Sequence, residues 1–126
     1  MSDRPLSPHL QIYRLPITGL VSITHRITGV LLSAGAVLWV VFLVSVAQGE
    51  ADYVRAQGVL DSVPGRVMLW GWIFALFFHL CHGVRHLIWD TVHGFERDTL
   101  TRFAWVEIGA SVLLTLGAFV LSLWRD

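Results

Sequence analysis

Long runs of apolar positions, interrupted by two polar connections, dominate the pattern of this chain. Residues 27–47, ITGVLLSAGAVLWVVFLVSVA, contain no charged side chain. About 20 apolar residues are enough to cross the roughly 30 Å hydrocarbon core of a bilayer as a helix. Two more apolar runs follow, so the pattern predicts transmembrane helices over residues 22–48, 66–90 and 103–124. We therefore expect an all-α membrane protein with three transmembrane helices.

The polar segments divide the chain around these predicted helices. Residues 48–66 and 91–102 form the two connections, which glycine and proline interrupt. Residues 1–21 contain Pro5, Pro8 and Pro16, which exclude one continuous helix there. We expect this short N-terminal segment to run along the membrane surface or to dock on another subunit. Residues 1–126 are then a single membrane-anchor domain.

Composition agrees with a membrane protein. The chain has 126 residues, of which 55% are hydrophobic and 14% charged, and its formal net charge is zero. Soluble domains carry roughly 25% charged residues. A neutral chain also offers no electrostatic attraction for nucleic acid. Cys81 is the single cysteine, so any haem would be held without a covalent CxxCH attachment.

The distribution of arginines predicts an orientation. With three spans, the N-terminus and the second connection lie on one side of the membrane. That side carries five arginines and the other carries three, namely Arg4, Arg14, Arg26, Arg97 and Arg102 against Arg55, Arg66 and Arg125. The positive-inside rule then places the N-terminus in the cytoplasm, in a bacterial inner membrane. In a mitochondrial inner membrane the equivalent side would be the matrix.

The second predicted helix ends in an unusual polar run, FFHLCHGVRHLIWD, residues 77–90. At 100° per residue, His79, His86 and Asp90 share one stripe, His82 lies at its edge and Arg85 lies further round. His79 is roughly 16 Å from Asp90 along the axis, near the middle of the bilayer. An imidazole there is costly unless it binds a metal or forms a strong hydrogen bond. Two hypotheses follow: an axial haem ligand, or a histidine bonded to a hydroxyl or water of a neighbouring helix.

A haem ligated by His79 would need a second ligand from elsewhere. His82 and His86 share the helix of His79 and cannot reach the opposite face of the same haem. His25 is expected roughly 12 Å nearer the cytoplasm, and His9 and His93 lie outside the predicted spans. The second ligand should therefore come from another chain, paired with this one in a helical bundle.

Two further polar features accompany the predicted helices. SITHRITG, residues 22–29, places Ser22, His25 and Arg26 on one face of the first helix. These residues either cap the helix and reach the lipid headgroups, or lie beside haem propionates and a quinone head, where the Arg26 guanidinium is a strong donor. Glu107 is predicted in the first turn of the third helix, where a carboxylate is favoured.

Three motifs together resemble the cytochrome b556 membrane-anchor subunits of succinate dehydrogenase, respiratory complex II. They are RPLSPHLQIYR, SITHRITG and HLCHGVRHLIWD. The family pattern is S-x-x-H-R-x-[ST]-G in the first span and H-x-x-x-G-[IV]-R-H-L-x-x-D in the second. Both parts occur here in order, and the three-span layout agrees, so the resemblance covers nearly the whole chain.

The resemblance implies a role for each matching residue. His79 would ligate the iron of haem b, with the partner histidine on a small membrane-anchor subunit. Ser22 and Arg26 would line the ubiquinone site near the iron–sulfur subunit, and His25 and Arg26 would lie close to the haem propionates. The remaining matches would have supporting roles, namely Arg85, His86 and Asp90. His82 falls at a variable position of the pattern.

The function implied by the resemblance is that of an electron-transfer anchor with no catalysis of its own. A flavoprotein subunit would oxidise succinate, and electrons would pass through iron–sulfur clusters to quinone beside this chain. Two alternatives stay open, a haem-free structural anchor and the anchor of a fumarate reductase. The sequence also leaves open the choice between ubiquinone and menaquinone.

Overall fold

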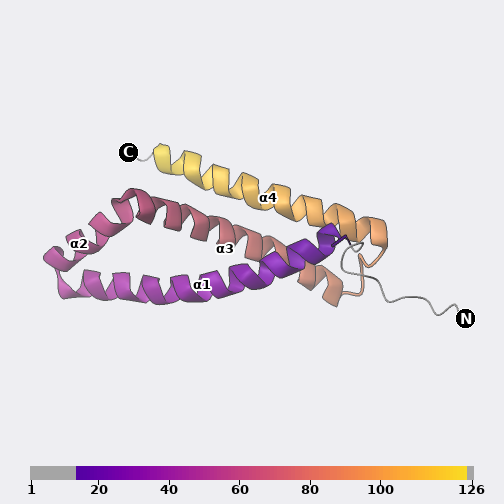
Figure 1. Ribbon diagram of the computed structural model, residues 1–126, viewed down its shortest axis with the longest axis horizontal. Helices are drawn as coiled ribbons and strands as arrows, with labels where there is room; N and C mark the ends of the chain where they lie inside the picture. Colours follow the sequence, from indigo (N-terminus) through magenta and orange to yellow (C-terminus); the bar gives the residue numbers. More distant parts are fainter. Residues whose placement is uncertain (1–13, 125–126) are drawn as a thin grey trace, which may run out of the picture.

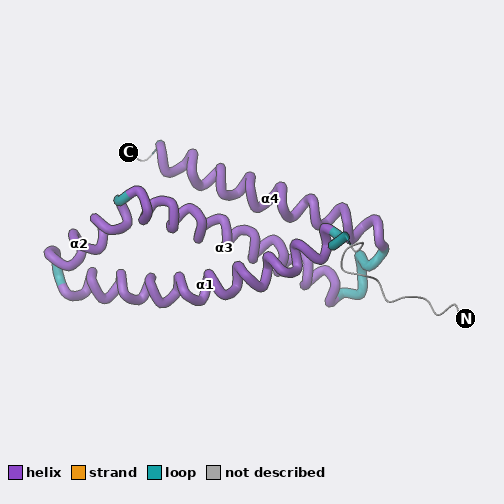
Figure 2. Tube along the Cα trace, in the orientation of Figure 1, coloured by secondary structure: helices purple, strands orange, loops and turns teal. Residues whose placement is uncertain are grey.

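The computed structural model of the chain describes residues 14–124, which contain four helices and no strand. The helices are α1 (Ile17–Gln48), α2 (Glu50–Asp61), α3 (Val63–Asp90) and α4 (Arg97–Leu123), shown in Figures 1 and 2. Helices α1, α3 and α4 are each long and apolar enough to cross a membrane. The predicted all-α membrane protein with three spans is confirmed. The first thirteen residues of the predicted N-terminal surface segment lie outside the described residues.

Helix α1 begins at Ile17, five residues before the predicted start at Ser22. Pro16 is the N-cap, and its carbonyl accepts hydrogen bonds from the backbone N–H groups of Gly19 and Leu20 at 2.9 and 3.2 Å. Proline suits a helix start because its φ is already fixed and its missing N–H is not needed there. Helix α1 ends at Gln48, and the φ of 120° at its C-cap Gly49 is strained for any residue with a Cβ.

Helix α4 begins at Arg97, six residues before the predicted start at Phe103. The prediction that Glu107 lies in the first turn is therefore wrong. At 3.6 residues per turn, Glu107 is almost three turns inside the helix, about 15 Å from its start. Residues 91–102 were predicted as a connection, but only its first half, residues 91–96 around Gly94 with its φ of 83°, is non-helical.

The first connection contains the short polar helix α2, which hydropathy did not reveal. Gly49 separates α2 from α1, and Ser62 separates it from α3. The Ser62 hydroxyl accepts a hydrogen bond from the Gly65 N–H at 3.2 Å, which is an N-cap for α3. The chain therefore reverses direction between α1 and α3 through a helix with caps at both of its junctions.

Helices α1 and α3 cross near the start of α1 and diverge toward α2, while α4 runs beside α3 (Figure 1). A small core joins the three long helices at the crossing end, where Val21, Phe78 and Ala104 are at most 3% exposed. Most other apolar side chains of the spans are exposed. Such a surface needs lipid or other helices around it.

One close contact fixes the spacing of α1 and α3 beyond the crossing. A Cβ added at Gly35 of α1 would lie 2.0 Å from Nε1 of Trp72 in α3. The indole therefore rests directly on the backbone of α1, which only glycine allows. Small residues at helix contacts of this kind are typical of membrane proteins.

Candidate functional site

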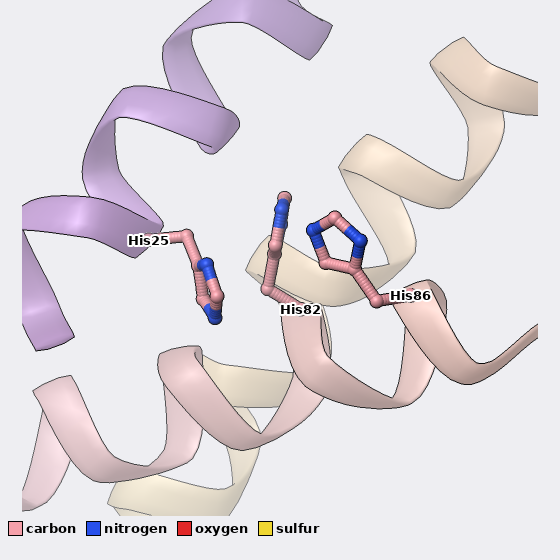
Figure 3. Close-up of side chains that lie close together, drawn as sticks. All are labelled: His25, His82 and His86. Atoms are coloured by element: carbon pink, nitrogen blue, oxygen red, sulfur yellow. The ribbon is translucent and has the colours of Figure 1, made fainter. Parts of the chain in front are cut away.

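Four histidines gather where α1 and α3 cross. His25 comes from α1, and His79, His82 and His86 come from α3. The His25 ring is stacked on His79 at 3.9 Å between ring centroids and on His82 at 4.3 Å, and lies 5.7 Å from His86. Figure 3 shows His25 facing His82 and His86 across the gap between the two helices.

This arrangement corrects the expected depth of His25. The sequence placed His25 roughly 12 Å nearer the cytoplasm than His79, but the two rings are in contact. The reason is the early start of α1 at Ile17, because His25 is then two turns inside the helix when α1 meets α3. The two predicted haem-site residues therefore lie at one level.

The hydrogen bonds of His79 define its tautomer. Its Nδ1 lies 3.2 Å from the carbonyl oxygen of His25 and 3.3 Å from the hydroxyl oxygen of Thr28. The Thr28 hydroxyl donates its own hydrogen to that same carbonyl oxygen, 2.8 Å away. The lone pairs of the Thr28 oxygen are therefore left to accept from Nδ1 of His79. Both neighbours are acceptors, so in the neutral imidazole Nδ1 carries the proton and Nε2 carries the lone pair. The ring also packs on Gly29, where an added Cβ would lie 3.2 Å from Cε1 of His79.

A buried polar group joins α3 to α4. Glu107 accepts a hydrogen bond from Nδ1 of His82 and one from Nη1 of Arg85, each at 2.9 Å. All three side chains are at most 4% exposed. Arg85 also donates to the carbonyl oxygen of Leu100 at 3.2 Å, and its guanidinium lies 4.5 Å from the centre of the Trp89 ring. This Glu107 cluster (His82, Arg85 and Glu107) thus balances a buried anion with a buried cation and a ring N–H.

Sequence reasoning missed the Glu107 cluster. Because Glu107 was predicted at a helix start, its pairing with His82 and Arg85 was not expected. His82 was assigned to a variable position of the family pattern. Arg85 was predicted among the supporting residues at the end of the span, and it is instead buried against α4. One signal was available, because an acidic residue followed by seventeen uncharged residues is expensive in a membrane helix unless it is paired.

The remaining predicted site residues are more open. Ser22 is half-buried and Arg26 is exposed, one turn apart on α1. Within residues 14–124 neither the Ser22 hydroxyl nor the Arg26 guanidinium has a hydrogen-bond or salt-bridge partner. His86 is exposed beside the other histidines, and Asp90 is the exposed last residue of α3. The structure therefore gathers the histidines and leaves Ser22, Arg26 and Asp90 without side-chain partners among residues 14–124.

Comparison with known proteins bears on this arrangement. The pattern of the family described as succinate dehydrogenase/fumarate reductase transmembrane subunit matches residues 1–118. The chain belongs to this family. It is 40% identical over 114 residues to a succinate dehydrogenase cytochrome b556 subunit of Paracoccus denitrificans, covering 90% of this chain and 88% of that protein.

Other members of the family give the same result. The chain is 34% identical over 117 residues to a succinate dehydrogenase cytochrome b556 subunit of Rickettsia felis, covering 91% of this chain and 90% of that protein. It is 35% identical over 118 residues to a mitochondrial succinate dehydrogenase cytochrome b560 subunit of Sus scrofa, covering 92% of this chain and 70% of that protein. The resemblance predicted from the three motifs is confirmed, and the chain is a multi-pass transmembrane subunit of this type. The roles of single residues stay predictions.

Proposed function

We propose that this chain is the membrane anchor of a succinate:quinone oxidoreductase that holds haem b through Nε2 of His79 and lines the quinone site with Ser22 and Arg26. The observation that carries the proposal is the bond from Nδ1 of His79 to the His25 carbonyl. Histidines that bind metals donate their other ring N–H to a carbonyl or carboxylate, which fixes the tautomer and orients the ring. A haem bound there would supply a one-electron carrier whose potential depends on its axial ligands and burial.

The proposed haem needs a second chain. His25 is stacked face to face on His79, with 17° between the ring planes, so it lies beside the ligand and not across an iron from it. His82 and His86 lie on the same helix as His79. The described residues would therefore supply one histidine to the haem, and a small membrane-anchor subunit would supply the other. His25 and Arg26 would lie near the propionates.

A haem-free structural anchor is the alternative, in which the bond at Nδ1 only holds the ring against α1 and Nε2 binds no metal. The two hypotheses differ only at Nε2. We expect His79→Ala to abolish the b-type absorption of the purified complex, whereas His93→Ala, an exposed histidine in the α3–α4 connection, should keep it. An unchanged reduced-minus-oxidised spectrum in His79→Ala would refute the ligand assignment.

The quinone part of the proposal rests on unused donors. Ser22 and Arg26 have no partner in the described chain and lie on one face of α1, so both can donate to quinone carbonyl oxygens. Such donors stabilise the negative charge that develops during reduction, as in an oxyanion site. Electrons would arrive from the flavoprotein subunit through the iron–sulfur subunit. This requires the start of α1 to lie on the side of those subunits, which is cytoplasmic in a bacterial inner membrane.

A ratio of two activities tests the quinone role. We expect Arg26→Leu to lower succinate:quinone activity by about tenfold or more, because one missing donor of this kind costs up to about 10²–10³ in rate. Succinate oxidation with a soluble acceptor should change little, since it bypasses the membrane. Arg102→Leu, another exposed arginine at this end, is the matched control. Equal losses in both assays would contradict the assignment of Arg26. Measuring fumarate reduction, the reverse reaction, in the same complexes distinguishes a succinate dehydrogenase anchor from a fumarate reductase anchor.

A further inference from the structure

We propose that Thr28 is a positioning residue for His79, and that its hydroxyl lowers the redox potential of the haem that His79 would ligate. Oγ1 of Thr28 lies 3.3 Å from Nδ1 of His79. Thr28 is 4% exposed, so its hydroxyl is shielded from water. The inference rests on the proposed role of His79 as a haem ligand, and it adds the side chain that holds this ligand.

The direction of the Thr28 hydroxyl is fixed within α1. The hydroxyl donates its hydrogen to the backbone carbonyl of His25 at 2.8 Å. Because a hydroxyl has one hydrogen and two lone pairs, the oxygen presents only a lone pair to Nδ1 of His79. Threonine suits this arrangement, since its oxygen can bond a carbonyl of the preceding turn of a helix. Thr28 is therefore oriented as an acceptor by its own helix.

The N–H at Nδ1 of His79 is shared between two oxygen atoms of α1. Nδ1 lies 3.2 Å from the His25 carbonyl oxygen and 3.3 Å from Oγ1 of Thr28, and the two oxygens are 2.8 Å apart. These distances form a nearly symmetrical triangle, so both oxygens accept from the same N–H. His25 contributes only its main chain to this bond. Within residues 14–124, Thr28 is the only side chain hydrogen-bonded to His79.

The ring of His79 is also held by its packing on the same turn. The His25 ring stacks on it at 3.9 Å between ring centroids. A Cβ added at Gly29 would lie 3.2 Å from Cε1 and 3.7 Å from Nδ1 of His79. Residues 25–29 thus supply the stacked ring, the close backbone and both acceptors. A substitution that keeps the shape of Thr28 should therefore change the hydrogen bonding of His79 with little change in packing.

Loss of the hydroxyl should raise the haem potential. A hydrogen-bond acceptor at the other ring nitrogen makes a ligating imidazole more basic. A more basic ligand favours the oxidised iron, because that iron carries the higher charge, and hydrogen bonds near the iron are one way in which proteins set haem potentials. Thr28→Val removes one acceptor and keeps the His25 carbonyl. We expect the ratio of oxidised to reduced haem to fall by about three- to tenfold, the size of one hydrogen bond. Since tenfold is about 59 mV for one electron, the potential should rise by about 30–60 mV.

Redox potentiometry of the purified complex tests the inference. Complexes with Thr28→Val, Thr28→Ser and Thr24→Val are compared with the wild type. We expect all of them to keep the b-type spectrum and only Thr28→Val to have a raised potential. Serine keeps the hydroxyl, and Thr24, one turn earlier on α1, donates to the Leu20 carbonyl instead. If the valine variant loses its haem, Thr28→Ala decides the question, because it removes the hydroxyl and adds no methyl group beside Nδ1.

Failure of this inference is distinct from failure of the haem proposal. A wild-type potential in the variant without the hydroxyl, or an equal rise in Thr28→Ser or Thr24→Val, would overturn the role of Thr28. Either result leaves His79 as the ligand, because the b-type spectrum is still present. The haem proposal fails on another observation, an unchanged spectrum in His79→Ala.

Discussion

Replacing Glu107 by leucine should be among the most destabilising single changes in this chain. The carboxylate is 4% exposed and accepts hydrogen bonds from Arg85 and His82. Glu107→Leu removes both acceptors and leaves the Arg85 cation buried without a counter-charge. Nη2 of Arg85 keeps the Leu100 carbonyl, which offers a dipole in place of a full charge.

Two independent estimates give a similar loss in the free energy of unfolding for Glu107→Leu. A hydrogen bond to a charged group contributes about 1.5–3 kcal/mol, and the Glu107 carboxylate accepts two such bonds. Breaking a buried ion pair by removing one partner costs about 3–5 kcal/mol. We therefore expect Glu107→Leu to lower the free energy of unfolding by about 3–5 kcal/mol. Val106→Leu, at an exposed neighbour in α4, should stay within about 0.5 kcal/mol.

A double variant separates the unpaired charge from simple loss of packing. Replacing a whole buried ion pair by apolar residues is often neutral, so Arg85→Leu with Glu107→Leu should be more stable than Glu107→Leu alone. It should remain below the wild type, because the His82 N–H loses its acceptor. The assay is the thermal unfolding midpoint of the purified complex, followed by tryptophan fluorescence. A double variant that melts below Glu107→Leu, or a Glu107→Leu that melts with the wild type, would refute the reasoning.

Two other predictions concern the helix contact and the haem. Gly35→Ala would put a methyl group 2.0 Å from Nε1 of Trp72, so we expect a lower melting midpoint despite the better helix propensity of alanine, worth about 1 kcal/mol. Gly58→Ala in α2, where nothing lies within 4 Å of the added Cβ, should be neutral or stabilising, and equal behaviour of the two variants would disprove the close contact. The chain expressed alone should not form a six-coordinate haem, because His79 is the only axial ligand we assign within it; a normal low-spin b-type spectrum without the partner subunit would contradict the ligand count.

The agreement between sequence and structure is strongest for the spans. Hydropathy is a sum over consecutive residues, so the three membrane helices could be read without knowledge of their packing. Helix ends were less predictable. Pro16 starts α1 five residues early and Arg97 starts α4 six residues early, because caps and polar first turns lie outside the apolar windows.

The order of apolar runs and motifs was enough to predict a three-span membrane protein of a recognisable family, with a histidine deep in its second span. The contact between His25 and His79, and the pairing of Glu107 with Arg85 and His82, became visible only in the folded chain. Periodicity places a residue on a face of its own helix and goes no further. Which faces meet, and at what depth, depends on where each helix begins and how the helices cross.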